Sequence, residues 1–182
     1  MDRTDQDLID ETLAGTLESY DVLMTRYEQL VYKVAYGFGK ERESALDITQ
    51  NTFVKAYHGL GTFRRNSNFK TWLARIAYHE GVNWTRKNRR HQRGHKPLED
   101  EIGLAAAGAD PEDEALQRER KAQILEGLQQ LSERHRLALT LRYFQGMPVR
   151  EVAEILQCSE GTAKNILFRG VRRLKQAVAP TA

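Results

Sequence analysis

The sequence predicts an all-α protein made of two small helical domains joined by a flexible linker. Outside the middle of the chain, apolar residues recur at steps of three and four, and no stretch alternates for long in the manner of a strand. Residues 93–119 interrupt this pattern with two prolines, three glycines and no aromatic side chain, a composition typical of linkers. A length of 182 residues suffices for two such domains.

The first domain is expected to span residues 1–92. Its helices are expected at residues 5–14, 19–38, 43–58 and 69–90. Gly37 and Gly39 are expected to end the second helix, because glycine favours other backbone conformations. Phe53 and Trp72 are assigned to the core, since large aromatic side chains at helical spacing are usually packing residues.

Charge divides the chain more sharply than its net value of +3 suggests. Residues 1–90 carry fourteen Lys and Arg against twelve Asp and Glu, and residues 91–126 carry five against nine. In residues 127–182 the balance is nine against four. The C-terminal part is therefore the basic one, which favours an acidic partner such as nucleic acid.

The second domain, residues 120–182, contains a helix-turn-helix pattern. Helices are expected at residues 115–130 and 131–144, and two more flank the turn "QCSEG". Ser159 is a good N-cap for the last helix, because its hydroxyl can accept a hydrogen bond from a first-turn amide. Two short helices across such a turn can place the second in the major groove of DNA.

The last helix carries side chains suited to DNA. Those within reach of bases or the nearest phosphates are Glu160, Gly161, Thr162, Lys164, Asn165, Phe168 and Arg169, whereas Arg172 and Arg173 suit phosphates farther along. Ile166 lies at the edge of the core face, where it packs or touches a thymine methyl. The alternative is that these cations only solvate the outer face of a helical hairpin.

Several classes of protein are excluded. No apolar run approaches the roughly 20 residues that span a bilayer, and the acidic start lacks the features of a signal peptide, so a cytoplasmic location is expected. Cys158 is the single cysteine, which rules out an internal disulfide. No phosphate-binding loop, paired catalytic carboxylates or metal-ligand cluster is recognisable, so no enzyme activity, cofactor or metal is expected.

Two segments resemble a known family. "EVAEILQCSEGTAKNILFRGVRRLK" is similar to region 4 of bacterial sigma factors, and "DITQNTFVKAY" followed by "FKTWLARIAYHEGVNWTRKNRR" looks like their region 2. Together with the linker, they resemble the two-domain extracytoplasmic-function (ECF) group of the sigma-70 family. The resemblance covers about two thirds of the chain.

The resemblance implies an initiation factor that directs RNA polymerase core to promoters and helps to melt them. It assigns the last helix to the −35 element and the first domain to the −10 element. The implied −10 contacts are Phe63, Arg64, Asn66, Ser67, Asn68, His79, Asn83, Arg86 and Lys87. A loop of small polar donors followed by cations suits a melted strand, because its bases need a pocket and its backbone needs positive charge.

The resemblance also implies protein partners. The helix at 43–58 looks like the surface that grips a coiled coil on the largest polymerase subunit, and the second domain is expected to meet the polymerase flap. The implied polymerase contacts are Asp47, Gln50, Asn51 and Lys55. The alternative for this helix is an ordinary solvated face. An anti-sigma protein is a further expected partner, with no residues assigned to it.

Three positions depart from the family pattern. Asn51 stands where many members have an acidic residue, His79 where asparagine is common, and Ile166 where arginine is frequent. A different functional class also fits the helix-turn-helix, namely a stand-alone regulator that binds duplex operator DNA without polymerase.

Overall fold

The computed structural model describes residues 3–39, 41–64, 68–88 and 111–178. Within these ranges the chain forms helices and turns and no strand, as the sequence predicts. None of the helices in this part of the chain combines the length and the hydropathy that a membrane span requires.

Helices α1 (Asp5–Leu13) and α2 (Leu17–Gly39) open the fold. The α1 N-terminus is closed by a capping box, in which Thr4 Oγ1 accepts from the Asp7 amide and the Asp7 carboxylate accepts from the Thr4 amide. Helix α2 runs through Gly37 and ends at Gly39, so the prediction that both glycines stop it is wrong for Gly37. A glycine inside a helix lowers its stability without breaking it when the flanking turns are buried.

Helices α3 (Arg42–Gly59) and α4 (Phe69–Asn88) pack on α2, with a 3₁₀ turn η1 (Leu60–Thr62) between them. Asn68 caps α4 by accepting a hydrogen bond from the Thr71 amide at 2.7 Å. Phe53 and Trp72 are both buried, which confirms their assignment to the core.

The C-terminal group contains α5 (Pro111–Gln130), α6 (Glu133–Leu139), a π-helical extension η2 (Thr140–Phe144), α7 (Val149–Ile155) and α8 (Glu160–Val178). Helix α5 begins four residues before the predicted start at 115. Pro111 is a linker signal in the sequence, but proline is also well tolerated in the first turn of a helix, where its missing amide hydrogen has no partner to lose.

Both α6 and α8 depend on close packing. An added Cβ at Gly170 of α8 would lie 3.3 Å from Cγ of Leu139 in α6. Ala163 and Leu167 are buried on the same side of α8. The core face of the last helix therefore packs on the rest of its group, which leaves the opposite side to solvent.

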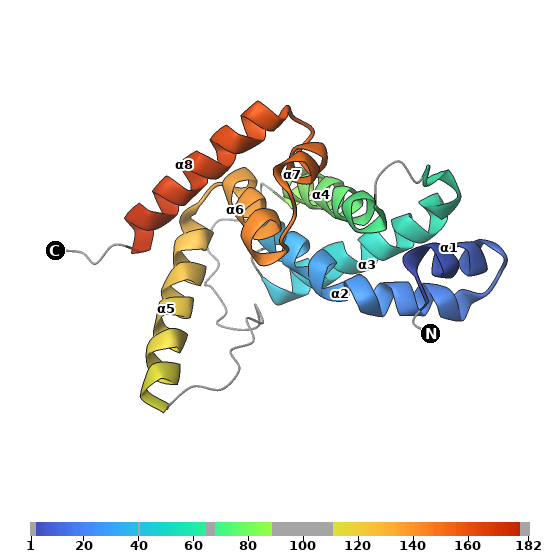
Figure 1. Ribbon diagram of the computed structural model, residues 1–182, viewed down its shortest axis with the longest axis horizontal. Helices are drawn as coiled ribbons and strands as arrows, with labels where there is room; N and C mark the ends of the chain where they lie inside the picture. The colour runs from blue at the N-terminus through green and yellow to red at the C-terminus, as the bar shows by residue number, and fades with distance from the viewer. Residues whose placement is uncertain (1–2, 40, 65–67, 89–110, 179–182) are drawn as a thin grey trace.

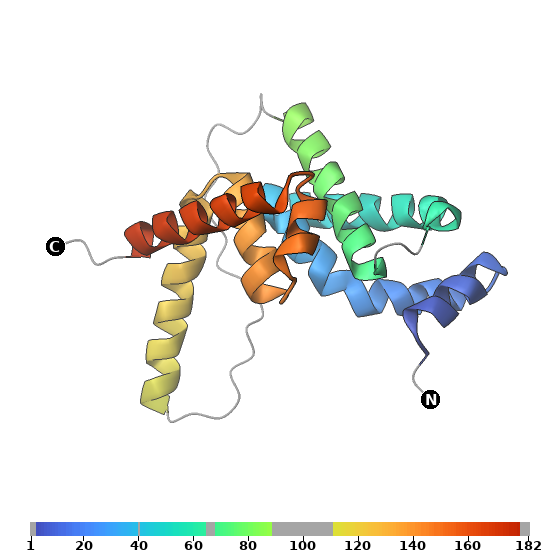
Figure 2. The same cartoon turned by 45° about the horizontal axis from the view of Figure 1, so that its top comes forward.

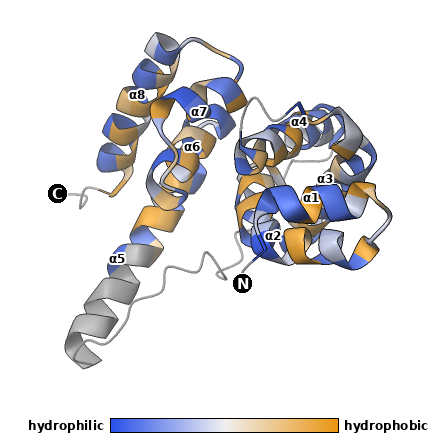
Figure 3. Ribbon diagram, turned by 45° about the vertical axis from the view of Figure 1, so that its right-hand side comes forward, coloured by the Kyte–Doolittle hydropathy of each residue, from blue (hydrophilic) through white to orange (hydrophobic). Residues whose placement is uncertain are grey.

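The two groups of helices lie side by side (Figures 1 and 2), with α7 against α4 and α6 near α2. In Figure 3, hydrophobic and hydrophilic positions alternate around the helices of both groups, and each group contains buried apolar residues. The arrangement brings the turn before α8 close to α4, so that Gln157 of this turn lies next to His79 of α4.

Candidate nucleic-acid interface

The N-terminus of α8 is built as its sequence predicts. Ser159 Oγ accepts a hydrogen bond from the Thr162 amide at 3.2 Å, and the two hydroxyls lie 2.9 Å apart. Glu160 stands in the first turn, where a carboxylate is favoured by the positive end of the helix dipole. The cap fixes where α8 starts and thereby which of its side chains face solvent.

All side chains predicted to face DNA from α8 are on its solvent side. Those that the structure places as exposed are Glu160, Gly161, Thr162, Lys164, Asn165, Phe168, Arg169, Arg172 and Arg173. Ile166 is partly buried and packs against the core, so of its two expected roles the structure shows packing. Cations, an amide and an aromatic ring on one uncovered helix face can contact both base edges and phosphates.

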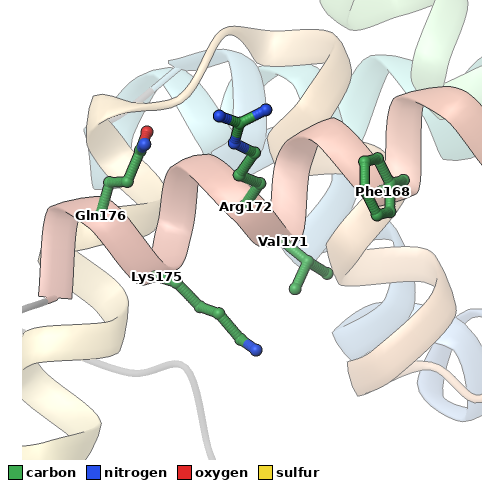
Figure 4. A pocket seen from close by; sticks show the side chains of 5 residues that line it. All are labelled: Phe168, Val171, Arg172, Lys175 and Gln176. Atoms are coloured by element: carbon green, nitrogen blue, oxygen red, sulfur yellow. The ribbon is translucent and has the colours of Figure 1, made fainter.

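A shallow pocket lies along the same helix (Figure 4). Its lining residues are Phe168, Val171, Arg172, Lys175 and Gln176. The side chain of Phe168 is 69% exposed, which is unusual for a phenylalanine in a folded domain. An exposed aromatic ring can contact the methyl group of a thymine, and cations beside the ring can contact the neighbouring phosphates of the DNA.

A second group of basic side chains lies where the start of α6 approaches α8. Burial and the nearby guanidinium groups of Arg173, Arg169 and Arg134 lower the pKa of His135. Ser132 Oγ lies 2.6 Å from Nδ1 of His135 and holds the ring in place. The sequence prediction missed Arg134 and His135, because only tertiary packing brings them to Arg169 and Arg173.

The predicted −10 residues of α4 fall into two groups. Asn83, Arg86 and Lys87 are exposed in the last turns of the helix. His79 is partly buried, and its Nε2 lies 3.0 Å from Nε2 of Gln157, in the turn before α8. Gln157 has a φ of 51°, a left-handed conformation that L residues seldom adopt.

The loop before α4 is only partly described. Asn66 and Ser67 lie outside the described residues, and Arg64 is exposed. Phe63 packs against Trp72 and Phe69, with ring centroids 5.2 and 5.8 Å away. Only part of the Phe63 ring is therefore accessible, and this aromatic cluster anchors the end of the loop to the core.

Polar side chains of α4 bind α7. The Glu151 carboxylate lies 3.1 Å from Asn68 Nδ2 and 2.8 Å from Thr71 Oγ1. Arg75 Nη1 lies 3.4 Å from Glu154 Oε1. The sequence prediction missed Thr71 and Arg75, because Thr71 falls among buried apolar neighbours in the sequence and Arg75 has no local partner.

A third surface lies on α3. The four predicted polymerase contacts, Asp47, Gln50, Asn51 and Lys55, are all exposed. Lys55 Nζ forms a 2.6 Å ion pair with Glu80 of α4, which holds part of this face to its neighbour. Two apolar residues of the same helix, Leu46 and Val54, are 46% and 50% exposed. Both lie off the buried stripe of α3, and this position in the sequence pattern could have identified them as surface residues.

Comparison with known families matches both groups of helices. Residues 23–91 match the Sigma-70 region 2 family. Residues 121–174 match the Sigma-70, region 4 family. The first match contains α3 and α4, and the second contains α6, α7 and most of α8.

Whole-chain comparison gives relatives of similar length. The chain is 32% identical to the RNA polymerase sigma-H factor of Pseudomonas aeruginosa, covering 97% of this chain and 94% of the relative. It is 31% identical to the ECF RNA polymerase sigma-E factor of Escherichia coli K12, covering 97% and 95%. It is 33% identical to the RNA polymerase sigma factor YlaC of Bacillus subtilis, covering 87% and 91%.

Solved structures share the fold. CnrH in complex with the cytosolic domain of CnrY matches with a TM-score of 0.69 and 23% identity, covering 98% of this chain and 99% of that one. The sigma factor RpoE of Bartonella quintana, in complex with the anti-sigma factor NepR, matches with a TM-score of 0.69 and 24% identity, covering 91% and 99%.

Proposed function

Because the chain belongs to the ECF group of the sigma-70 family of RNA polymerase sigma factors, we propose that it directs core polymerase to specific promoters and favours their melting. The observation that carries the proposal is that both family regions occur in one chain whose relatives match it almost end to end. The chain supplies binding energy for initiation, and the catalysis is performed by the polymerase.

Helix α8 is assigned to the −35 element. Lys164 and Arg169 are the base-edge donors, Asn165 suits adenine, and Phe168 suits a thymine methyl. Gly161 and Thr162 leave the capped helix start open to the approach of a phosphate. Arg172 and Arg173 extend the phosphate contacts along the helix.

Helix α4 and the loop before it are assigned to the −10 element. The cations at the end of α4, Arg86 and Lys87, follow the backbone of the melted strand, and Asn83 and His79 meet its bases. We assign the recognition of an unstacked base to Asn66, Ser67 and Asn68, together with Phe63 and Arg64. Unstacking costs a few kcal/mol and least at TA steps, which favours A·T-rich sequence here.

The exposed face of α3 is assigned to the largest polymerase subunit. Gln50, Asp47 and Asn51 provide its polar contacts, and Lys55 contributes through its stem beside the Glu80 ion pair. The flap of the polymerase is assigned to the second domain. An anti-sigma protein is a further proposed partner, because the similar RpoE of Bartonella quintana forms a complex with the anti-sigma factor NepR.

The residue ranges of the two domains follow from the same assignment. We assign residues 1–92 to core binding and the −10 element, residues 93–119 to the acidic connection, and residues 120–182 to the −35 element. Promoter binding places the protein with the chromosome, in the cytoplasm.

In vitro transcription tests the proposal. The purified chain is added to bacterial core polymerase with a library of promoter fragments, and transcript start sites are mapped. Specific starts that require the added chain are expected. Tight, specific binding of the chain alone to duplex DNA, with no selective starts from polymerase, would instead identify a stand-alone regulator.

A further inference from the structure

The start of α6 carries an unusual helix cap. Ser132 stands at the N-cap, where a serine hydroxyl usually accepts a hydrogen bond from an amide of the first turn. Here the hydroxyl makes no such bond, and its Oγ lies 2.6 Å from Nδ1 of His135 instead. The serine therefore orients an imidazole rather than closing the helix end. Because Nδ1 is engaged in this way, Nε2 is the nitrogen that His135 has left for another partner.

Three guanidinium groups act on this imidazole. Arg134 precedes His135 on α6, and Arg169 and Arg173 stand one turn apart on α8. All three arginines are exposed, and we call the four residues the α6–α8 basic cluster. Within the part of the chain that the structure describes, no carboxylate pairs with any of the three arginines. The cluster therefore carries positive charge that these parts of the protein do not neutralise.

Acidic residues of the neighbouring helices act elsewhere. Glu133, at the start of α6, interacts electrostatically with the buried Arg136. Glu151 and Glu154 of α7 accept hydrogen bonds from α4. Like charges that are gathered without a counter-charge repel one another, so this arrangement gains most from an anion that binds from outside.

The α6–α8 basic cluster adjoins the surface assigned to the −35 element. Arg169 and Arg173 belong to that surface, and α6 packs along α8 beside them. Arg134 Nη2 lies 3.5 Å from the carbonyl oxygen of Leu156, at the end of α7, which keeps Arg134 near the turn before α8. A helix in the major groove has a phosphate backbone along each flank, because the groove is only about 12 Å wide. The cluster is placed to meet one of these backbones.

We propose that Arg134, His135 and Arg173 bind one backbone phosphate of duplex DNA at this flank of α8, and that His135 binds it in the protonated form. The inference rests on the proposed function, because it adds two residues of α6 to the surface assigned to the −35 element. Arg169 remains assigned to a base edge and adds its charge to the site. Phosphate oxygens accept charge-assisted hydrogen bonds from guanidinium and imidazolium groups.

Protonation of His135 is expected to depend on the DNA. In the free chain, burial lowers the pKa of His135, and the guanidinium groups of Arg173, Arg169 and Arg134 lower it further, so the ring is largely neutral at neutral pH. A phosphate brings negative charge to the ring, which favours the imidazolium and raises the pKa of His135 in the complex. Because the complex then holds a proton that the free chain lacks, the affinity for DNA rises as the pH falls below neutrality.

Duplex binding at two pH values tests the site. The full chain is titrated against a fluorescein-labelled DNA duplex of mixed sequence at low salt, where phosphate contacts are strongest, and the affinity is read from fluorescence anisotropy. We expect the gain in affinity from pH 7.5 to pH 6.0 to be about threefold to tenfold larger in the unmodified chain than in His135→Gln. His58→Gln, which changes an exposed histidine of α3, is expected to keep the full gain. An equal gain in the unmodified chain and in His135→Gln overturns the proposal.

Titration of the ring itself gives a second measurement, on the unmodified chain. The Cε1 proton resonance of His135, identified by its absence in His135→Gln, is followed against pH by NMR spectroscopy with and without the duplex. We expect the duplex to raise the pKa of His135, and inorganic phosphate at the same ionic strength to leave it nearly unchanged. A pKa that the duplex does not change overturns the phosphate contact, and an equal rise with inorganic phosphate overturns its assignment to DNA.

Arg134→Gln tests the other residue of α6. Loss of one phosphate contact is expected to weaken duplex binding about threefold to tenfold and to reduce the slope of log affinity against log salt by about one. Arg120→Gln, which removes an exposed arginine of α5, is the matched control and is expected to change neither quantity. A slope that is the same in Arg134→Gln and Arg120→Gln overturns the assignment of Arg134 to a phosphate.

Transcription separates this inference from the proposed function. A chain that directs no specific starts contradicts the sigma-factor assignment, while the duplex affinities and the titration of His135 still decide whether the phosphate site exists. A chain that directs specific starts, but whose duplex affinity has the same pH dependence with and without His135, supports the proposed function and overturns this inference alone.

Discussion

The ring of Phe38 lies directly over Gly81, so that a Cβ added at Gly81 would be 2.1 Å from Cδ2 of Phe38. Phe38 is buried in α2, and Gly81 lies in α4 between the residues assigned to the −10 element. The missing side chain lets the two helices approach at this point. The position of the surface assigned to the −10 element therefore depends on a buried glycine.

Gly81→Ala is expected to destabilise the protein by about 1 to 3 kcal/mol, because the added methyl group overpacks the α2–α4 contact. Urea denaturation monitored by circular dichroism measures the change. Gly37→Ala is the control, because nothing lies within 4 Å of its added Cβ and it is also inside a helix. There we expect a gain of up to about 1 kcal/mol from helix propensity. Equal effects at the two glycines would contradict the packing argument.

Arg136→Met is expected to stabilise the chain by about 1 to 4 kcal/mol, because it replaces a buried guanidinium with an apolar side chain of similar length. Two of the Arg136 nitrogens lack partners, and burial lowers its pKa. Thermal and urea denaturation give the change, with Arg134→Met as an exposed control expected to stay within about 0.5 kcal/mol. A marked loss of stability in Arg136→Met would show that the guanidinium is needed where it lies.

The pH dependence of stability should report on His135. Its pKa is lowered in the folded protein by burial and by three arginines, so the folded state binds a proton less readily than the unfolded state. The stability from a neutral His135 is present above the ordinary histidine pKa of about 6.5 and is lost as the pH falls through and below it. His135→Asn is expected to lose less stability than the unmodified chain between pH 7.5 and 5.5 in urea titrations. If the stability of His135→Asn and that of the unmodified chain change equally with pH, His135 does not cause the pH dependence.

Arg169→Ala is expected to reduce transcription by a factor corresponding to about 1 to 3 kcal/mol and to relax the preference at one −35 position. Arg173→Ala, one turn later on the same exposed face, is the control for a phosphate contact. It is expected to weaken all promoters about equally. Start-site mapping on a library of −35 variants distinguishes the two. An equal loss of transcription on all −35 variants for Arg169→Ala would show that Arg169 contacts a phosphate and not a base.

Removal of a polar side chain on α3, by Gln50→Ala or Asp47→Ala, is expected to weaken association with core polymerase while leaving helicity unchanged. The reason is that both residues are exposed on the face assigned to the largest subunit. Titration of labelled chain with core polymerase measures the affinity. Asp21→Ala, an exposed position on α2, is the matched control. Core affinity that does not differ among the three variants would remove this face from the proposal.

The local features of this protein follow from short stretches of its sequence. Helical periodicity indicated the helices, the serine at position 159 indicated the start of α8, and the spacing within α8 separated buried Ala163 and Leu167 from exposed Lys164 and Arg169. These features depend on neighbours within one or two turns, so the information lies in a short window. The same reasoning misjudged Gly37, because tertiary packing outweighs the weak preference of one glycine.

The contacts between distant segments depend instead on the packing of the whole fold. The carboxylate of Glu151 accepts a hydrogen bond from Thr71, and that of Glu154 accepts one from Arg75, although about 80 residues separate the partners in each pair. Gln157 adopts a left-handed conformation that brings its side chain to His79, and Phe38 fills the space over Gly81. No periodic pattern encodes such pairs, because each depends on how two separately formed helices pack rather than on the preferences of the residues within either helix.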